Sequence, residues 1–173
     1  MPYLGTFVEI NVRTYVVDAT GRRAVWFWSL DVPRSLIVGV ARTAFALPYC
    51  WSPGAEHLEP EPGRHRYTMR RRWPAGDANA RIDFTVGAGI ADDDVDELSH
   101  FLSARWGLLT TRRDRVLRGA VSHPPWPLFE IDEHSIDQTV IEAAGLSTPT
   151  GEPHAMYSPG VDVEVGWLRR VGI

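Results

Sequence analysis

The chain has 173 residues, of which 44% are hydrophobic and 23% are charged, and these ordinary globular values exclude a disordered chain. A chain of this length predicts a single domain spanning residues 1–173 that buries about two thirds of its unfolded surface. The net charge of -4 excludes a general nucleic-acid binder, because such proteins present a strongly basic surface.

The types of basic residue and the number of cysteines limit which reactions the chain can catalyse and which cellular compartment it suits. All 18 positions counted as lysine or arginine hold arginine, so the sequence has no lysine. The one cysteine, Cys50, excludes an internal disulfide and is typical of a reducing compartment. No signal peptide is visible, and the most apolar stretch, Ser35 to Ala41, is far shorter than the roughly 20 residues that cross a bilayer. We therefore expect a cytoplasmic protein without a membrane partner.

Two strands and a helix are predicted first along the chain. Residues 9–17 alternate between an aliphatic face and a polar face, and residues 24–30 are apolar on both faces, as in a central strand. Asp31 is expected to cap a helix that runs to about Ala46 and ends before Pro48. Because this helix carries few charges, it should be buried.

The remaining elements complete an α+β pattern. Further strands are expected at 64–73, 80–86, 107–111, 115–122, 126–132, 154–157 and 161–165, with 64–73 and 80–86 forming an antiparallel pair. Asp93 or Asp94 should cap a second helix, and a capping-box spacing at 135–138 predicts a third that ends at Gly145. The prediction is mostly antiparallel sheet forming a partial β-barrel, with two or three helices packed on it.

Six strings in this order resemble the YqjF-like family of bacterial proteins, which is similar in fold to acetoacetate decarboxylase. They are Glu9-x-Asn11-Val12-Arg13-Thr14-Tyr15, Phe27-x-Ser29-Leu30-Asp31, Leu47-Pro48-Tyr49, Phe101-Leu102-x-x-Arg105-Trp106, His123-Pro124-Pro125-Trp126-Pro127-Leu128 and Tyr157-Ser158-Pro159-Gly160-Val161-Asp162-Val163. The resemblance implies an acetoacetate decarboxylase-like barrel with an interior pocket.

The sequence departs from these families in two ways. Members of the YqjF-like family carry an additional N-terminal stretch before the Asn-Val-Arg-Thr-Tyr string, so we expect an open sheet, a partner that fills the gap, or a start at an internal methionine. In acetoacetate decarboxylase, a buried helix leads to two adjacent lysines, one of which forms a Schiff base. By that pattern the two positions fall on Tyr49 and Cys50, and neither forms an imine with a ketone.

The polar face of the first predicted strand is the leading candidate for a site. It carries Glu9, Asn11 and Arg13 opposite a uniformly aliphatic face. One interpretation places this face in the interior, where Arg13 grips a ligand carboxylate or carbonyl, Asn11 is a further ligand contact and Glu9 acts as general base or orienter. The other interpretation is the solvated face of a half-exposed strand. The resemblance to the decarboxylases, which carry a glutamate on a similarly placed strand, supports the first interpretation.

Three other residues are candidate ligand contacts, each with a simpler alternative. Tyr49 would donate a hydrogen bond to a bound oxygen or only line the wall. Cys50 would be a nucleophile if its pKa were lowered, but a free cysteine is more often a small buried hydrophobe. His123 would shuttle a proton or only brace its proline-rich segment. The six histidines show no paired spacing, so we expect neither a metal site nor a cofactor.

These residues lead to two hypotheses from different classes. The first is a small-molecule-binding barrel, acting as a non-Schiff-base enzyme on a carbonyl or carboxylate compound, with Glu9, Arg13 and Tyr49 as its catalytic residues. The alternative is a non-catalytic interaction or structural protein that uses an open sheet edge to form a homodimer or bind another chain. The sequence identifies neither a substrate nor a reaction.

Overall fold

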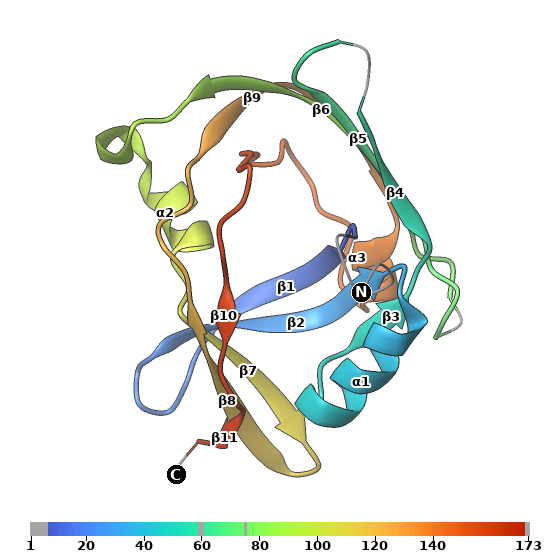
Figure 1. Cartoon of the computed structure of the whole chain (residues 1–173), viewed down its shortest axis with the longest axis vertical. Coiled ribbons are helices and arrows are strands. Elements are labelled where there is room, and N and C mark those ends of the chain that lie inside the picture. Colours follow the sequence, from blue (N-terminus) through green and yellow to red (C-terminus); the bar gives the residue numbers. More distant parts are fainter. Residues whose placement is uncertain (1–6, 59–60, 75, 172–173) are drawn as a thin grey trace.

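The computed structural model describes residues 7–58, 61–74 and 76–171 of the chain. Among these residues the strands form two sheets, of seven and four strands, on opposite sides of the molecule (Figure 1). The segment that follows the last strand of the smaller sheet crosses between them on its way to the C-terminus (Figure 1). No helix among the described residues is long and apolar enough to span a bilayer.

The larger sheet is mixed and is centred on β2. Its members are β1 (Ile10–Val17), β2 (Arg23–Val32), β3 (Tyr49–Trp51), β7 (Gly107–Arg112), β8 (Arg115–Ser122), β10 (Glu164–Val165) and β11 (Arg169–Arg170). Strand β2 pairs with β1 antiparallel and with β3 and β7 in parallel, which confirms the prediction of a central strand. The predicted hairpin of β7 and β8 is also confirmed.

The smaller sheet is antiparallel throughout. It consists of β4 (Gly54–Leu58), β5 (Arg64–Arg70), β6 (Asn79–Gly89) and β9 (Phe129–Gln138). Strands β5 and β6 form the expected antiparallel pair, in which Arg66 lies opposite Asp83 and binds it as an ion pair. Favourable cross-strand charge pairs of this kind help to fix the register.

The expected barrel is not closed, since the described strands form two separate sheets. The sheet is also less antiparallel than predicted, because helix α1 (Ser35–Phe45) connects β2 to β3 and returns the chain in the same direction. A helical crossover is the usual way to join parallel neighbours. The α+β class with mostly sheet is as predicted.

The prediction that Asp31 caps α1 is wrong. Strand β2 continues to Val32, and Asp31 is buried within it at 1% exposure. There Arg71 donates from Nε and Nη2 to the two carboxylate oxygens, each at 2.7 Å, and the Ser52 hydroxyl donates at 2.6 Å. A buried guanidinium requires a compensating negative charge. Pairing with Arg71 therefore stabilises the protein more than capping the helix with Asp31 would. Helix α1 is also less buried than predicted, since Leu36 and Val40 are more than half exposed.

The other two helices begin later than the sequence suggested. Helix α2 (Glu97–Ser103) is capped by Asp96 and not by Asp93 or Asp94, which belong to a short 3-10 helix. The third helix, α3 (Val140–Ala143), is present and ends before Gly145 as expected, but its predicted start at 135–138 is wrong, because these residues continue β9 alongside β6. Hydrogen bonds to a neighbouring strand outweigh a local capping pattern. The predicted strand at 154–157 is reduced to one bridge between Tyr157 and Phe129.

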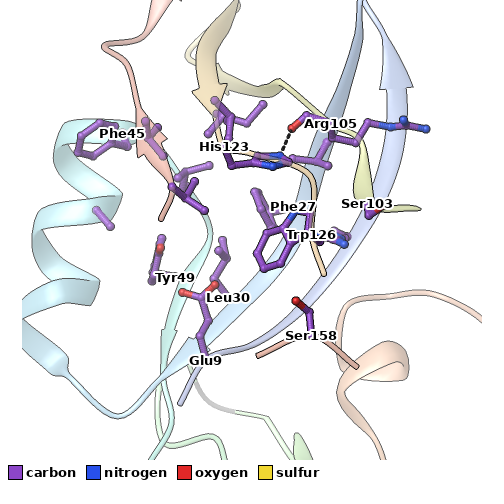
Figure 2. Close-up of a pocket in the computed structure, with 18 of the residues that line it drawn as sticks. Glu9, Phe27, Leu30, Phe45, Tyr49, Ser103, Arg105, His123, Trp126 and Ser158 are labelled. Atoms are coloured by element: carbon purple, nitrogen blue, oxygen red, sulfur yellow. Dashed lines mark hydrogen bonds between the residues drawn. The ribbon is translucent and has the colours of Figure 1, made fainter. Parts of the chain in front are cut away.

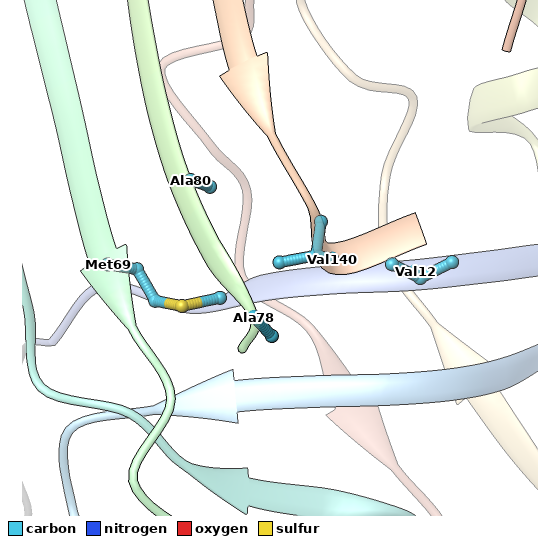
Figure 3. Packing of buried hydrophobic residues seen from close by; sticks show 5 residues of the cluster. All are labelled: Val12, Met69, Ala78, Ala80 and Val140. Atoms are coloured by element: carbon cyan, nitrogen blue, oxygen red, sulfur yellow. The ribbon is translucent and has the colours of Figure 1, made fainter. Parts of the chain in front are cut away.

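The aliphatic face of β1 belongs to the hydrophobic core. Val12 packs in a buried cluster with Met69 of β5, Ala78 just before β6, Ala80 in β6, and Val140 of α3 (Figure 3). Ile10 packs against the same cluster. Since side chains alternate along a strand, burying this face turns Glu9 and Arg13 toward the opposite side.

Candidate functional site

A cavity of about 810 Å³ opens on that opposite side of β1. Most of its wall is apolar, and the few polar groups gather in two places (Figure 2). The lining residues come from Glu9 and β1, from β2, from helix α1 and the segment through β3 that follows it, from residues 102–108, from the 121–128 segment and from the C-terminal segment between Met156 and Val165. This volume and this kind of lining are typical of small-molecule sites.

A bulge in β2 determines which of its side chains face the cavity. Val12 pairs with Ser29 and Arg13 pairs with Phe27, so Trp28 is an extra residue on β2. Beyond the bulge the alternation of faces is shifted by one residue, and Phe27 and Leu30 both line the cavity. Regular alternation along residues 24–30 would have placed these two side chains on opposite faces.

Glu9 and Tyr49 lie beside each other at the edge of the cavity near α1 (Figure 2), close enough that each shifts the pKa of the other. The accessible surface of Glu9 faces the cavity, yet the protein surrounds this carboxyl closely enough that burial raises its pKa above the ordinary range. Burial and the neighbouring Glu9 charge both raise the pKa of Tyr49, so its hydroxyl stays protonated and is available as a hydrogen-bond donor. A carboxyl with a raised pKa is suited to proton transfer near neutral pH.

Asn11 contributes to the site only through Glu9. Its side-chain amide donates to Glu9 Oε1 at 3.4 Å, and it does not line the cavity. This contact helps to orient the carboxyl group. The structure thus brings Asn11 to the Glu9 carboxyl and not to the cavity wall where the sequence interpretation had placed it.

Arg13 lines the cavity with an exposed side chain. Its Nη2 donates weakly to the Leu102 carbonyl oxygen at 3.4 Å, and its guanidinium carbon lies 5.7 Å from the centre of the Tyr15 ring. No acidic side chain among the described residues lies within ion-pair distance of it, so its charge remains available to an anion from outside the chain.

Arg105 is a second cation at the cavity, and it was not among the site residues expected from the sequence. Its side chain is 6% exposed and lies 4.0 Å from the centre of the Phe101 ring. Nη1 donates to the Ala104 carbonyl oxygen, whereas Nε and Nη2 are buried without a hydrogen-bond partner. Burial lowers the pKa of this guanidinium, and Arg23 and Arg13 lower it further. The only sequence signal was its place in the Phe101-Leu102-x-x-Arg105-Trp106 string.

His123 lines the cavity but uses its ring nitrogens locally. Nε2 lies 3.2 Å from the Arg105 carbonyl oxygen (dashed line in Figure 2), and Nδ1 lies 2.7 Å from the carbonyl oxygen of Pro124. The ring stacks on Trp106 and packs against Trp126. These contacts favour the bracing role over the proton shuttle, since they hold the loop that carries Arg105.

Cys50 does not line the cavity. Side chains alternate along β3, so Tyr49 points into the cavity while Cys50 is buried behind it at 4% exposure. Its Sγ donates to the Pro48 carbonyl oxygen at 3.6 Å, and burial raises the pKa of the thiol. This environment matches the alternative of a small buried hydrophobe. The described residues also contain no group of three or more histidine, cysteine or acidic side chains placed to hold a metal ion.

The fold resembles that of the acetoacetate decarboxylases. The crystal structure of the enzyme from Legionella pneumophila superposes with a TM-score of 0.60 at 10% identity, over 97% of this chain and 68% of that chain. A second acetoacetate decarboxylase structure gives a TM-score of 0.53 at 10% identity, over 95% of this chain and 65% of that one. At this level of identity the likeness concerns the fold alone.

The chain belongs to the DUF2071 family, described as an uncharacterized conserved protein, whose model matches residues 1–162. The uncharacterized protein YqjF of Bacillus subtilis (strain 168) is 29% identical over 170 residues, which are 98% of this chain and 69% of that protein. The resemblance drawn from the six sequence strings is thereby confirmed, both for the family and for its likeness in fold to acetoacetate decarboxylase.

Proposed function

We propose that the cavity binds a small carboxylate or carbonyl compound and acts on it without a Schiff base. The observation that carries this proposal is the joint presence, in one apolar cavity, of the Glu9–Tyr49 pair and of Arg13, which has no acidic partner among the residues that the structure describes. Imine chemistry on a lysine is excluded within these 173 residues, because they contain no lysine. Arg13 anchors the ligand through its carboxylate or carbonyl oxygen.

Glu9 is the proton-transferring group in this proposal. Its ionised carboxyl takes a proton from the carbon next to the ligand carbonyl, and the negative charge moves to the carbonyl oxygen. Tyr49 donates a hydrogen bond to that oxygen and stabilises the charge that develops there. Glu9 also borders a second pocket of about 480 Å³, lined in part by Glu56 and Tyr67.

Ligand binding by an Arg13 variant tests this function. Arg13→Ala should abolish binding of small keto and carboxylic acids in isothermal titration calorimetry while leaving the thermal midpoint nearly unchanged. The matched control is Arg115→Ala, since Arg115 is an exposed strand residue outside the cavity. Equal binding by the wild type and Arg13→Ala, or a large loss of stability without a change in binding, would assign Arg13 a structural role instead.

An interaction protein remains the second candidate function. It is supported by β1, which ends its sheet and pairs with β2 alone among the described strands. An edge strand offers backbone groups to a second copy of the chain or to another protein. Analytical ultracentrifugation distinguishes the two proposals, since a strict monomer that binds carboxylates supports the cavity, and a stable dimer that ignores them supports the edge.

A further inference from the structure

The apolar wall of the cavity carries more exposed hydrophobic surface than a small polar ligand would use. Leu36 and Val40 of α1 are 56% and 53% exposed, and Val163 and Val165 of the C-terminal segment are 44% and 51% exposed. All four line the same cavity, so α1 and the C-terminal segment form one continuous apolar surface. Contact with water makes such a surface unfavourable, and an apolar group that covers it is stabilised.

The positive charge of the cavity lies apart from this surface. Figure 2 shows Arg105 and Ser103 on one side, Phe45 of α1 on the other, and the rings of Phe27 and Trp126 between them. Arg13 and Arg105 have no acidic partner among the described residues. Because Nε and Nη2 of Arg105 are buried, Arg105 supplies positive potential through the wall while exposed Arg13 makes the contact.

We infer that the ligand is an amphipathic monocarboxylate, with its head group at Arg13 and an alkyl or aryl chain along α1 and Val163–Val165. This inference rests on the proposed function and narrows its ligand class. A cavity of about 810 Å³ is far larger than acetate requires, since one water molecule occupies only about 30 Å³ in the liquid. A chain of medium length fills the apolar part of the cavity.

A series of straight-chain acids tests the inference by calorimetry on the full chain. Acetate, butanoate, hexanoate and octanoate are the probes, and affinity should rise about fourfold for each added methylene group. Octanol is the control for the head group: the wild type should prefer octanoate, and Arg13→Gln should lose that preference. A chain-length series that stays flat would overturn the inference.

A near-isosteric pair of substitutions locates the alkyl chain. Val40→Thr and Val165→Thr each place a hydroxyl against the chain, which should weaken octanoate binding roughly fivefold or more while leaving acetate unaffected. The matched control is Val116→Thr, since Val116 is 44% exposed on β8 but does not line the cavity. An equal effect of all three variants on octanoate would contradict the proposed position of the chain. Failure of every carboxylate to bind would instead refute the underlying function.

Discussion

Replacing Asp31 by asparagine should destabilise the fold severely, since Asp31 neutralises a buried arginine. Asp31 and Arg71 are 1% and 9% exposed, and two hydrogen bonds of 2.7 Å join them. Asp31→Asn removes the charge and leaves Arg71 buried without compensation, which costs about 3–5 kcal/mol. This loss is a large part of the roughly 5–15 kcal/mol that stabilises a domain, and it corresponds to a fall of about 6 to 20 °C in the thermal midpoint.

Urea unfolding followed by circular dichroism measures this loss. Glu61→Gln is the matched control, because the Glu61–Arg64 pair is exposed and should contribute at most about 1 kcal/mol. Since Asp31 also binds Ser52, which follows β3, its loss should loosen the strand that positions Tyr49. The reasoning is refuted if Asp31→Asn and Glu61→Gln lower the free energy of unfolding equally.

Three further predictions follow from the site and its supports. Because burial raises the pKa of Glu9, the folded state binds the Glu9 proton more tightly than the unfolded state does. The free energy of unfolding should therefore fall as the pH rises from the ordinary pKa of a glutamate through the folded pKa. Glu9→Gln should remove that part of the pH dependence of the thermal midpoint, and an unchanged profile would contradict the raised pKa. Asp96→Ala should lower the free energy of unfolding, measured with a denaturant, by about 1 kcal/mol. The reason is that Asp96 accepts hydrogen bonds from the backbone N–H groups of Leu98 and Ser99 at the start of α2. A loss near zero would disprove the cap. Cys50 should react with iodoacetamide far more slowly than a free thiol, because burial raises its pKa, and rapid alkylation of the folded protein would place it at an accessible surface.

Periodicity predicted the strands well because alternation directly reports which face is buried. The aliphatic face of β1 packs in the core through Ile10 and Val12, and the pairing of β5 with β6 follows the expected pattern. The polar face of β1 likewise faces the cavity through Glu9 and Arg13. These features depend on local sequence and on one buried face, so they can be derived without knowledge of distant contacts.

The misplaced elements depended on partners far along the chain. Asp31 has the residue type and position of a helix cap, but Arg71, forty residues later, determines its role. Residues 135–138 match a capping box, but β6 holds them in a strand. The bulge at Trp28 and the burial of Arg105 also arise from tertiary packing, so no local pattern announced them.

A crystal structure of the protein soaked with octanoate tests the central claim most directly. The account predicts electron density inside the cavity, with the carboxylate within hydrogen-bond distance of Arg13 and the alkyl chain against Leu36, Val40 and Val165. A cavity that stays free of octanoate, or octanoate bound elsewhere on the surface, would contradict the claim that this cavity is a carboxylate-binding site.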